Sequence, residues 1–141
     1  MILLDTDHLT LLKYTANPLC QALDARMQAS RDREIGTTII SVEEQWRGWF
    51  AVVARHRGVR RQVKAYQELV ELHAFLSEWT IMPFDDAAAD RFEQLRAGGV
   101  RIGSMDLKIA SIALVHDALV LSANLQDFRK VPGLRVESWL D

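Results

Sequence analysis

The residues best suited to chemistry in this sequence are acids that follow predicted strands or begin predicted helices. The first is Asp5, which comes directly after the apolar run 2–4, a run typical of a buried parallel strand. Ligands of open α/β sheets bind just outside the carboxyl ends of such strands. A carboxylate is costly to bury there unless a cation meets it. Oxygen-bearing side chains in equivalent places elsewhere in the chain are Glu44, Asp106, Asn124 and Asp127.

Each of these acids, taken alone, also has a purely structural explanation. Asp5 or Asp7 could cap the helix that follows, because Asp is a preferred N-cap residue. Ser41 and Glu44 fit the S-x-x-E capping box, in which Glu44 would only bind the backbone N–H of Ser41. An acid in the first turn of a helix, such as Asp106, is favoured by the helix dipole. Only the convergence of several acids favours a catalytic site.

The elements that must bring these acids together alternate along the chain. The pattern predicts strands at 2–4, 35–40, 80–84, 118–121 and 134–139. It predicts one helix over about 8–14 and another over 87–97. Three further helices are predicted to begin near residues 19, 41 and 105, and a long helix is predicted to end near residue 79. Such alternation favours a three-layer α/β/α fold around a mainly parallel sheet of about five strands. In that arrangement the strand ends, and therefore the acids, meet at one edge.

Two further expectations concern the middle of the chain. The apolar side chains expected to form the inner face of the long helix ending near 79 are Val63, Tyr66, Leu69, Val70 and Leu76. Gly48, four residues after Glu44, is expected to let another element approach closely.

Composition and charge limit the class of protein. The 141 residues, 49% apolar and 26% charged, are enough for a single domain over 1–141 with a real core. A net charge of −2 excludes a global basic field, so any polyanion site must be local. Cys20 is the only cysteine, which excludes disulfide frameworks and cysteine-based metal sites within one chain. No signal-peptide pattern and no membrane-spanning apolar run occur, so we expect a cytoplasmic protein.

The densest basic stretch lies at 55–64 and offers a local contact for RNA or for an acidic partner segment. Basic runs of this kind are more often a solvated helix face. The side chains concerned are Arg55, Arg57, Arg60, Arg61 and Lys64.

Several carboxylates within a few ångströms of one another repel, and some would stay protonated without a counterion. Mg²⁺ or Mn²⁺, hard cations that prefer carboxylate and water oxygens, resolve this conflict. The chemistry that fits such a site is hydrolysis of a phosphodiester bond by a metal-activated water. No cysteine or histidine nucleophile is placed for an alternative route.

Four segments in this order resemble PIN-domain proteins, and among them the VapC-type toxins of bacterial toxin–antitoxin pairs. The segments are Asp5-Thr6-Asp7, the stretch 41–48 with its S-x-x-E-x-x-x-G pattern, Ile-Gly-Ser-Met-Asp at 102–106, and the stretch 121–134. The resemblance covers nearly the whole chain, and it selects Glu44 over Glu43.

The resemblance implies a PIN-like fold and an endoribonuclease that depends on Mg²⁺ or Mn²⁺. It implies that Asp5, Glu44 and Asp106 are catalytic metal ligands, with Asn124 or Asp127 in a fourth position. Many relatives have an acid where this chain has Asn124. The neutral side chain of Asn124 favours one tightly held ion over two. It also implies inhibition by a VapB-like antitoxin and a homodimer. We expect a basic antitoxin side chain to enter the acidic crevice, with its chain along the apolar surface of the early helices.

Two other functions fit parts of the sequence. Asp5 and Asp7 have the D-x-D spacing of a haloacid-dehalogenase-like phosphohydrolase, but Leu9 stands where that motif has Thr or Val, and no paired acids follow in the required form. The chain could also be a PIN-like binding module without catalysis. The intact Asp5, Glu44 and Asp106 argue against that second alternative.

Overall fold

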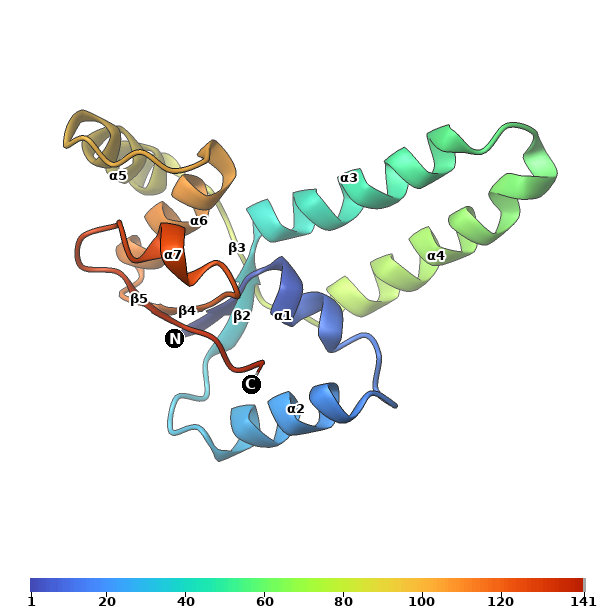
Figure 1. Cartoon of the computed structure of the whole chain (residues 1–141), viewed down its shortest axis with the longest axis horizontal. Coiled ribbons are helices and arrows are strands. Elements are labelled where there is room, and N and C mark those ends of the chain that lie inside the picture. Colours follow the sequence, from blue (N-terminus) through green and yellow to red (C-terminus); the bar gives the residue numbers. More distant parts are fainter. Residues whose placement is uncertain (141) are drawn as a thin grey trace.

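A five-stranded parallel sheet forms the centre of the structure, a computed structural model that describes residues 1–140 (Figure 1). The strands are β1 (Ile2–Leu4), β2 (Ile35–Thr38), β3 (Ile81–Met82), β4 (Leu119–Leu121) and β5 (Arg135–Glu137), in the order β3-β2-β1-β4-β5. Every neighbouring pair is parallel. The predicted sheet is therefore confirmed, and the central place of β1 puts its carboxyl end between those of β2 and β4.

Helices cover both faces of the sheet and complete the three-layer α/β/α fold. They are α1 (Thr6–Leu11), α2 (Pro18–Ala29), α3 (Ile39–Arg55), α4 (Val59–Ser77), α5 (Asp86–Ala97), α6 (Ser104–Val115) and α7 (Leu125–Phe128). Alternate residues of β1 enter two separate cores: Leu3 packs in one with α6, and Ile2 and Leu4 pack in the other with α1, α2 and α4. Within residues 1–140, no helix is both long and apolar enough to cross a membrane.

The start of α3 differs from the prediction in a way that matters for the site. The predicted strand 35–40 ends at Thr38, and α3 begins at Ile39. Thr38 is the N-cap, and its Oγ1 accepts a hydrogen bond from the backbone N–H of Ser41 at 3.2 Å. The predicted capping box of Ser41 and Glu44 is therefore wrong, because Ser41 already lies inside the helix. Glu44 is left free to turn toward β1.

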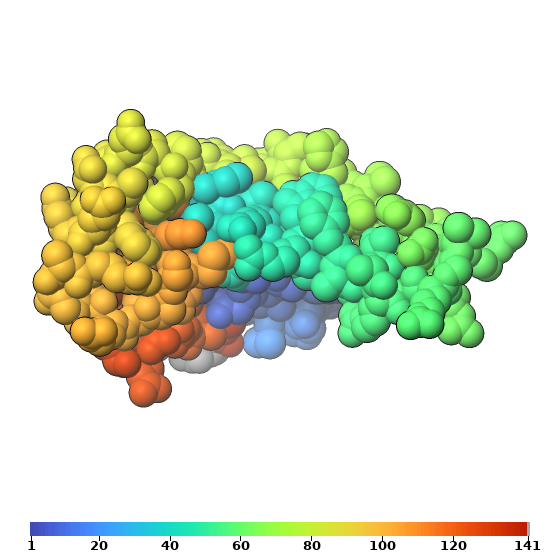
Figure 2. Space-filling view, turned by 90° about the horizontal axis from the view of Figure 1, so that it is seen from above, coloured from blue at the N-terminus to red at the C-terminus, as the bar shows by residue number. Residues whose placement is uncertain are grey.

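Helices α3 and α4 form an arm that extends away from the sheet (Figures 1 and 2). The predicted inner face of α4 is mostly wrong: Val63, Tyr66 and Val70 are exposed, with 71% of Val70 accessible to solvent. The buried side chains of α4 are instead Ala65, Leu72 and Leu76. Apolar side chains stay exposed here because the outer part of the arm extends beyond the sheet (Figure 1). The exposed apolar side chains of the arm also include Phe50 and Val59.

Two glycines allow a matched test of strand packing. A Cβ on Gly36 would lie 2.6 Å from the backbone oxygen of Thr80, so β2 can approach that segment only without a side chain. We expect Gly36→Ala to lower the free energy of unfolding by about 1–3 kcal/mol. Gly48 in α3 has no atom within 4 Å of an added Cβ, contrary to the predicted close approach, so Gly48→Ala should be neutral or stabilising by up to about 1 kcal/mol. Urea unfolding of both variants measures the contrast, and equal stability of the two would contradict it.

Candidate active site

Asp5 is the most buried acid of the site, with 7% of its surface accessible. It is also the N-cap of α1, since its Oδ1 accepts a hydrogen bond from the Thr6 N–H at 2.7 Å. The hydroxyl of Ser122, at the end of β4, donates to its Oδ2 at 2.8 Å, and the hydroxyl of Ser41 in α3 lies 3.5 Å from Oδ1. The carboxylate is thus fixed by groups from three segments of the chain.

Glu44 approaches β1 from the second turn of α3. The hydroxyl of Thr6 donates a hydrogen bond to Glu44 Oε2 at 2.6 Å, which orients the side chain toward Asp5. Glu43, one residue earlier, is exposed and pairs instead with Arg47 one turn along the helix. The structure therefore places Glu44 at the strand ends and Glu43 in solvent.

Asp106 and Asp127 are joined through Asn124. The side-chain N–H groups of Asn124 donate to Asp106 Oδ2 at 2.8 Å and to Asp127 Oδ2 at 3.1 Å. Asp106 lies in the first turn of α6, and Asp127 lies in the short helix α7. Asn124 thus directs its donor nitrogen, and not its oxygen, toward the two acids. Asp127 is also paired with Lys130 at 3.5 Å, at the outer side of the cluster.

Three carboxyls of the site, those of Asp5, Glu44 and Asp106, have pKa values raised by burial and by neighbouring carboxylates. Burial raises the pKa of Asp5, and the charges of Asp7 and Asp106 raise it further. Burial likewise raises the pKa of Glu44, with a further contribution from the charge of Asp5. Burial also raises the pKa of Asp106, and Glu44 and Asp127 are among the charges that add to the shift. Hydrogen bonds oppose these shifts without cancelling them, so the folded protein holds repelling carboxyls that a cation would relieve.

Asp7 has a different role in the structure. Its Oδ1 bonds to Nδ1 of the fully buried His8 at 2.8 Å, and its Oδ2 accepts from the Ala123 N–H at 3.0 Å. Nε2 of His8 accepts the backbone N–H of Trp139, so His8 donates through Nδ1. Burial alone would raise the pKa of Asp7, but the bonds from His8 and Ala123 hold it below its usual range. Asp7 therefore helps to tie Ala123 and, through His8, the C-terminal segment to α1, and it lacks the raised pKa of an acid catalyst.

The donor set fits a hard divalent cation. Among residues 1–140, no three carboxyl, imidazole or thiol groups converge closely enough to bind one ion all by direct contact. Mg²⁺ in proteins keeps several waters and is commonly held by only one or two carboxylates. Asp5 and Asp106, repelling and partly desolvated, are the residues that would hold such an ion, with Glu44 beside them.

The predicted basic contact lies away from this cluster. Arg55 is eleven positions beyond Glu44 on α3, which places it about 16 Å along the helix at 1.5 Å per residue. The whole run, from Arg55 to Lys64, surrounds the turn at the tip of the arm (Figure 1). The structure therefore does not bring these side chains together with the acids.

Sequence reasoning missed the hydroxyl groups that orient the acids. Thr6 and Ser122 hold Glu44 and Asp5 across 38 and 117 residues of sequence. Ser122 also accepts the backbone N–H of Asn124 at 3.0 Å, so the same hydroxyl shapes the loop that carries the fourth position. The sequence signal that could have identified Thr6 and Ser122 is the position of each residue just after a predicted strand.

Comparison with known proteins finds relatives named ribonuclease or endonuclease. "Ribonuclease VapC2" of Rickettsia felis is 33% identical over 86 residues, which are 58% of this chain and 64% of that protein. The "tRNA(fMet)-specific endonuclease VapC" of Salmonella typhimurium is 29% identical over 86 residues, 58% of this chain and 65% of that protein. The chain thus spans just under two thirds of the length of these relatives.

Solved structures match over a longer range. The structure of VapBC2 from Rickettsia felis bound to a promoter DNA fragment includes a chain with a TM-score of 0.74 and 25% identity, covering 99% of both chains. A chain of DNA-bound VapBC from Salmonella typhimurium has the same TM-score at 22% identity, covering 98% of this chain and 97% of that one, which supports the fold. The family model for the PIN domain matches residues 2–134. This match, over a chain with a five-stranded parallel sheet, shows that the chain belongs to the PIN domain family.

Proposed function

We propose that this protein is an endoribonuclease that depends on Mg²⁺ or Mn²⁺ and serves as the toxin of a toxin–antitoxin pair. The observation that carries the proposal is the set of repelling carboxyls of Asp5, Glu44 and Asp106 at adjoining strand and helix ends of a PIN fold. Relatives named ribonuclease or tRNA-specific endonuclease support the same reaction. A haloacid-dehalogenase-like reaction is not favoured, because Asp7 is engaged by His8 and Ala123.

Each residue of the site has a task in this reaction. Asp5 and Asp106 would hold the cation, and Glu44, oriented by Thr6, would accept a hydrogen bond from the attacking water. The chemistry that Mg²⁺ or Mn²⁺ supplies when bound is activation of that water and stabilisation of the phosphate charge. Asn124, which bonds Asp106 and Asp127, would keep both carboxylates aligned.

The proposal is tested by incubating the purified protein with a mixed pool of cellular RNA in Mn²⁺ or in EDTA. We expect discrete cleavage products with Mn²⁺ and intact RNA with EDTA. Cleavage at the same rate in EDTA would contradict a metal-dependent reaction, and no cleavage under either condition would favour the binding-module alternative.

Thr6 provides a graded test of how Glu44 is positioned. Thr6→Val keeps the shape of the side chain but removes the 2.6 Å hydrogen bond to Glu44. Since groups that orient metal-site side chains typically contribute 10- to 100-fold, we expect cleavage in Mn²⁺ to fall at least about 10-fold. Thr15→Val, at an exposed position, is the matched control. A Thr6→Val enzyme as fast as the control would show that Glu44 needs no orientation by this bond.

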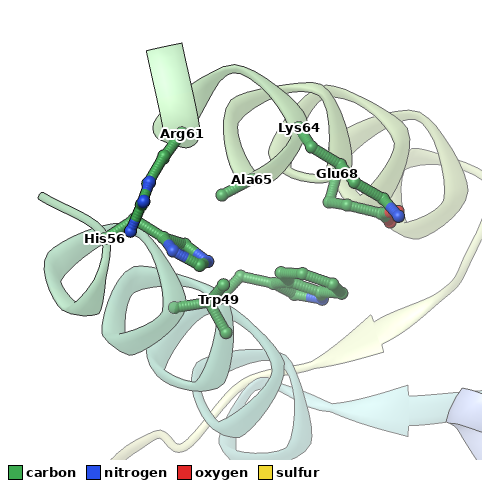
Figure 3. A pocket seen from close by; sticks show the side chains of 7 residues that line it. Trp49, His56, Arg61, Lys64, Ala65 and Glu68 are labelled. Atoms are coloured by element: carbon green, nitrogen blue, oxygen red, sulfur yellow. The ribbon is translucent and has the colours of Figure 1, made fainter. Parts of the chain in front are cut away.

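The arm supports the proposal of a protein partner. Exposed apolar side chains on α3 and α4 include Phe50 and Val59, at 56% and 84% accessibility. Between the two helices lies a pocket of about 430 Å³ where Trp49 and His56 face Ala65 (Figure 3). We propose a VapB-like antitoxin as the partner, because related structures are VapBC complexes, and a homodimer as the form of the toxin. Expression of the protein alone should then arrest cell growth, and co-expression with an adjacent small reading frame should restore it.

A further inference from the structure

A basic cleft adjoins the acidic cluster on the side of α5 and α6. It has a volume of about 510 Å³ and is lined by Arg96, Val100, Arg101, Ile102, Gly103 and Asp127. Asp127 belongs both to this cleft and to the hydrogen-bonded group of Asn124 and Asp106, so the cleft opens beside the acids. Its size lies within the range of pockets that bind small ligands.

The two arginines of the cleft are available for a ligand. Across residues 1–140, neither Arg96 nor Arg101 forms an ion pair with a carboxylate. The guanidinium of Arg96 lies 5.0 Å from the centroid of the Phe92 ring, one helical turn earlier, which holds it at the surface with its N–H groups still free. Guanidinium groups in this state bind phosphate through paired hydrogen bonds.

The positive surface continues beyond this cleft. A second hollow of about 460 Å³ shares Val100 and Arg101 with the first and is also lined by Lys130. Arg101 therefore lines both hollows. Arg96, Arg101 and Lys130, the last paired with Asp127, thus form a basic strip along the two hollows.

We propose that this strip binds the backbone of single-stranded RNA next to the scissile phosphate, with Arg101 as the principal phosphate contact. The inference rests on the proposed nuclease function and names a substrate-binding surface for it. The acidic cluster by itself repels RNA, so a nearby arginine without a carboxylate partner is needed to bind the flanking phosphates. Val100 and Ile102, in the wall of the cleft, provide apolar surface for a ribose or base.

The basic run of the arm is less suited to this task. Figure 2 shows the α3–α4 turn and the segment joining α5 to α6 at opposite ends of the molecule. The second segment lines a cleft together with one of the site's acids, Asp127. Phosphates next to the scissile bond would therefore reach Arg101 and not Arg57.

The test measures binding without cleavage. Fluorescence anisotropy with a short single-stranded RNA, with Asp106→Asn present in every protein, reports affinity and its salt dependence. We expect Arg101→Ala to weaken binding about five-fold at low salt and to reduce the slope of log affinity against log salt by about 0.7, the loss of one phosphate contact. Arg101→Lys should retain most of the affinity because it retains the charge.

Arg31→Ala is the matched control, since Arg31 is exposed near the amino-terminal end of β2, on the opposite edge of the sheet. Equal binding by the Arg101→Ala and Arg31→Ala proteins would overturn the inference. So would an Arg101→Ala protein that loses affinity for the antitoxin but not for RNA. Because the assay does not require cleavage, a failure of the nuclease proposal would be seen separately, as an absence of Mn²⁺-dependent products from the wild-type protein.

Discussion

Asp5→Asn and Asp106→Asn are each expected to lower the Mn²⁺-dependent rate of RNA cleavage by at least about 100-fold. Each change removes one of the two negative charges that would hold the cation, whose contribution to the transition state is several kcal/mol. Asp5→Asn keeps a side-chain oxygen for the Thr6 N–H, and Asp106→Asn keeps one for the Asn124 amide. The expected loss is therefore one of charge and not of fold. Single-turnover cleavage of a fixed RNA measures it.

Asp90→Asn is the matched control for these variants. Asp90 is an exposed acid of α5, away from the strand ends. Its replacement should leave the cleavage rate within about two-fold of wild type, as expected for a surface substitution. A fall in rate with Asp90→Asn as large as with Asp5→Asn would mean that overall charge, and not the cluster, determines activity.

The second large effect concerns stability. Asp106→Asn is expected to raise the melting temperature of the metal-free protein by a few degrees, although it lowers the expected rate of cleavage. The wild-type carboxyl has its pKa raised by burial and by the charges of Glu44, Asp127 and Asp7, so its ionised form destabilises the fold. Added Mn²⁺ should raise the melting temperature of the wild type and leave the variant nearly unchanged. Differential scanning fluorimetry with and without Mn²⁺ gives all four values.

The pH dependence of stability follows with a definite sign. Asp5, Glu44 and Asp106 have raised pKa values in the folded state, so the folded protein binds more protons than the unfolded chain above the usual values of 3.8 for Asp and 4.5 for Glu. The stability of the metal-free protein should therefore fall as the pH rises from these usual values through the raised pKa values of the three groups. Asp7 and Asp32 have lowered pKa values, so the stability that they contribute is lost as the pH falls below 3.8. A wild-type protein whose stability rises steadily from pH 4 to pH 7 without metal would contradict strain in the cluster.

Sequence reasoning succeeded where a local pattern determines the structure. Three apolar residues before Asp5 fix a buried central strand, and the apolar spacing of α6 fixes the helix that carries Asp106. It failed at the start of α3 because Ile39 and Ile40 have the β-branched character of a strand. Ile40 packs in the core from the first helical turn, and Thr38 supplies the cap.

Other features depended on contacts that no local pattern records. The buried face of α4 was predicted wrongly because the arm extends beyond the sheet. Tyr66 and Val70, which the pattern placed in a core, are therefore exposed to solvent. The hydrogen bonds of Thr6 and Ser122 join segments that are distant in sequence. The basic cleft likewise forms only because the α5–α6 connection folds against Asp127 in α7.

The most direct test of the account is titration of Mn²⁺ into the metal-free protein by isothermal titration calorimetry. If Asp5 and Asp106 share a divalent cation, the wild type and Asp90→Asn bind Mn²⁺ with the same affinity, and both Asp5→Asn and Asp106→Asn lose measurable binding. Unchanged Mn²⁺ affinity in the Asp5→Asn and Asp106→Asn proteins would contradict it.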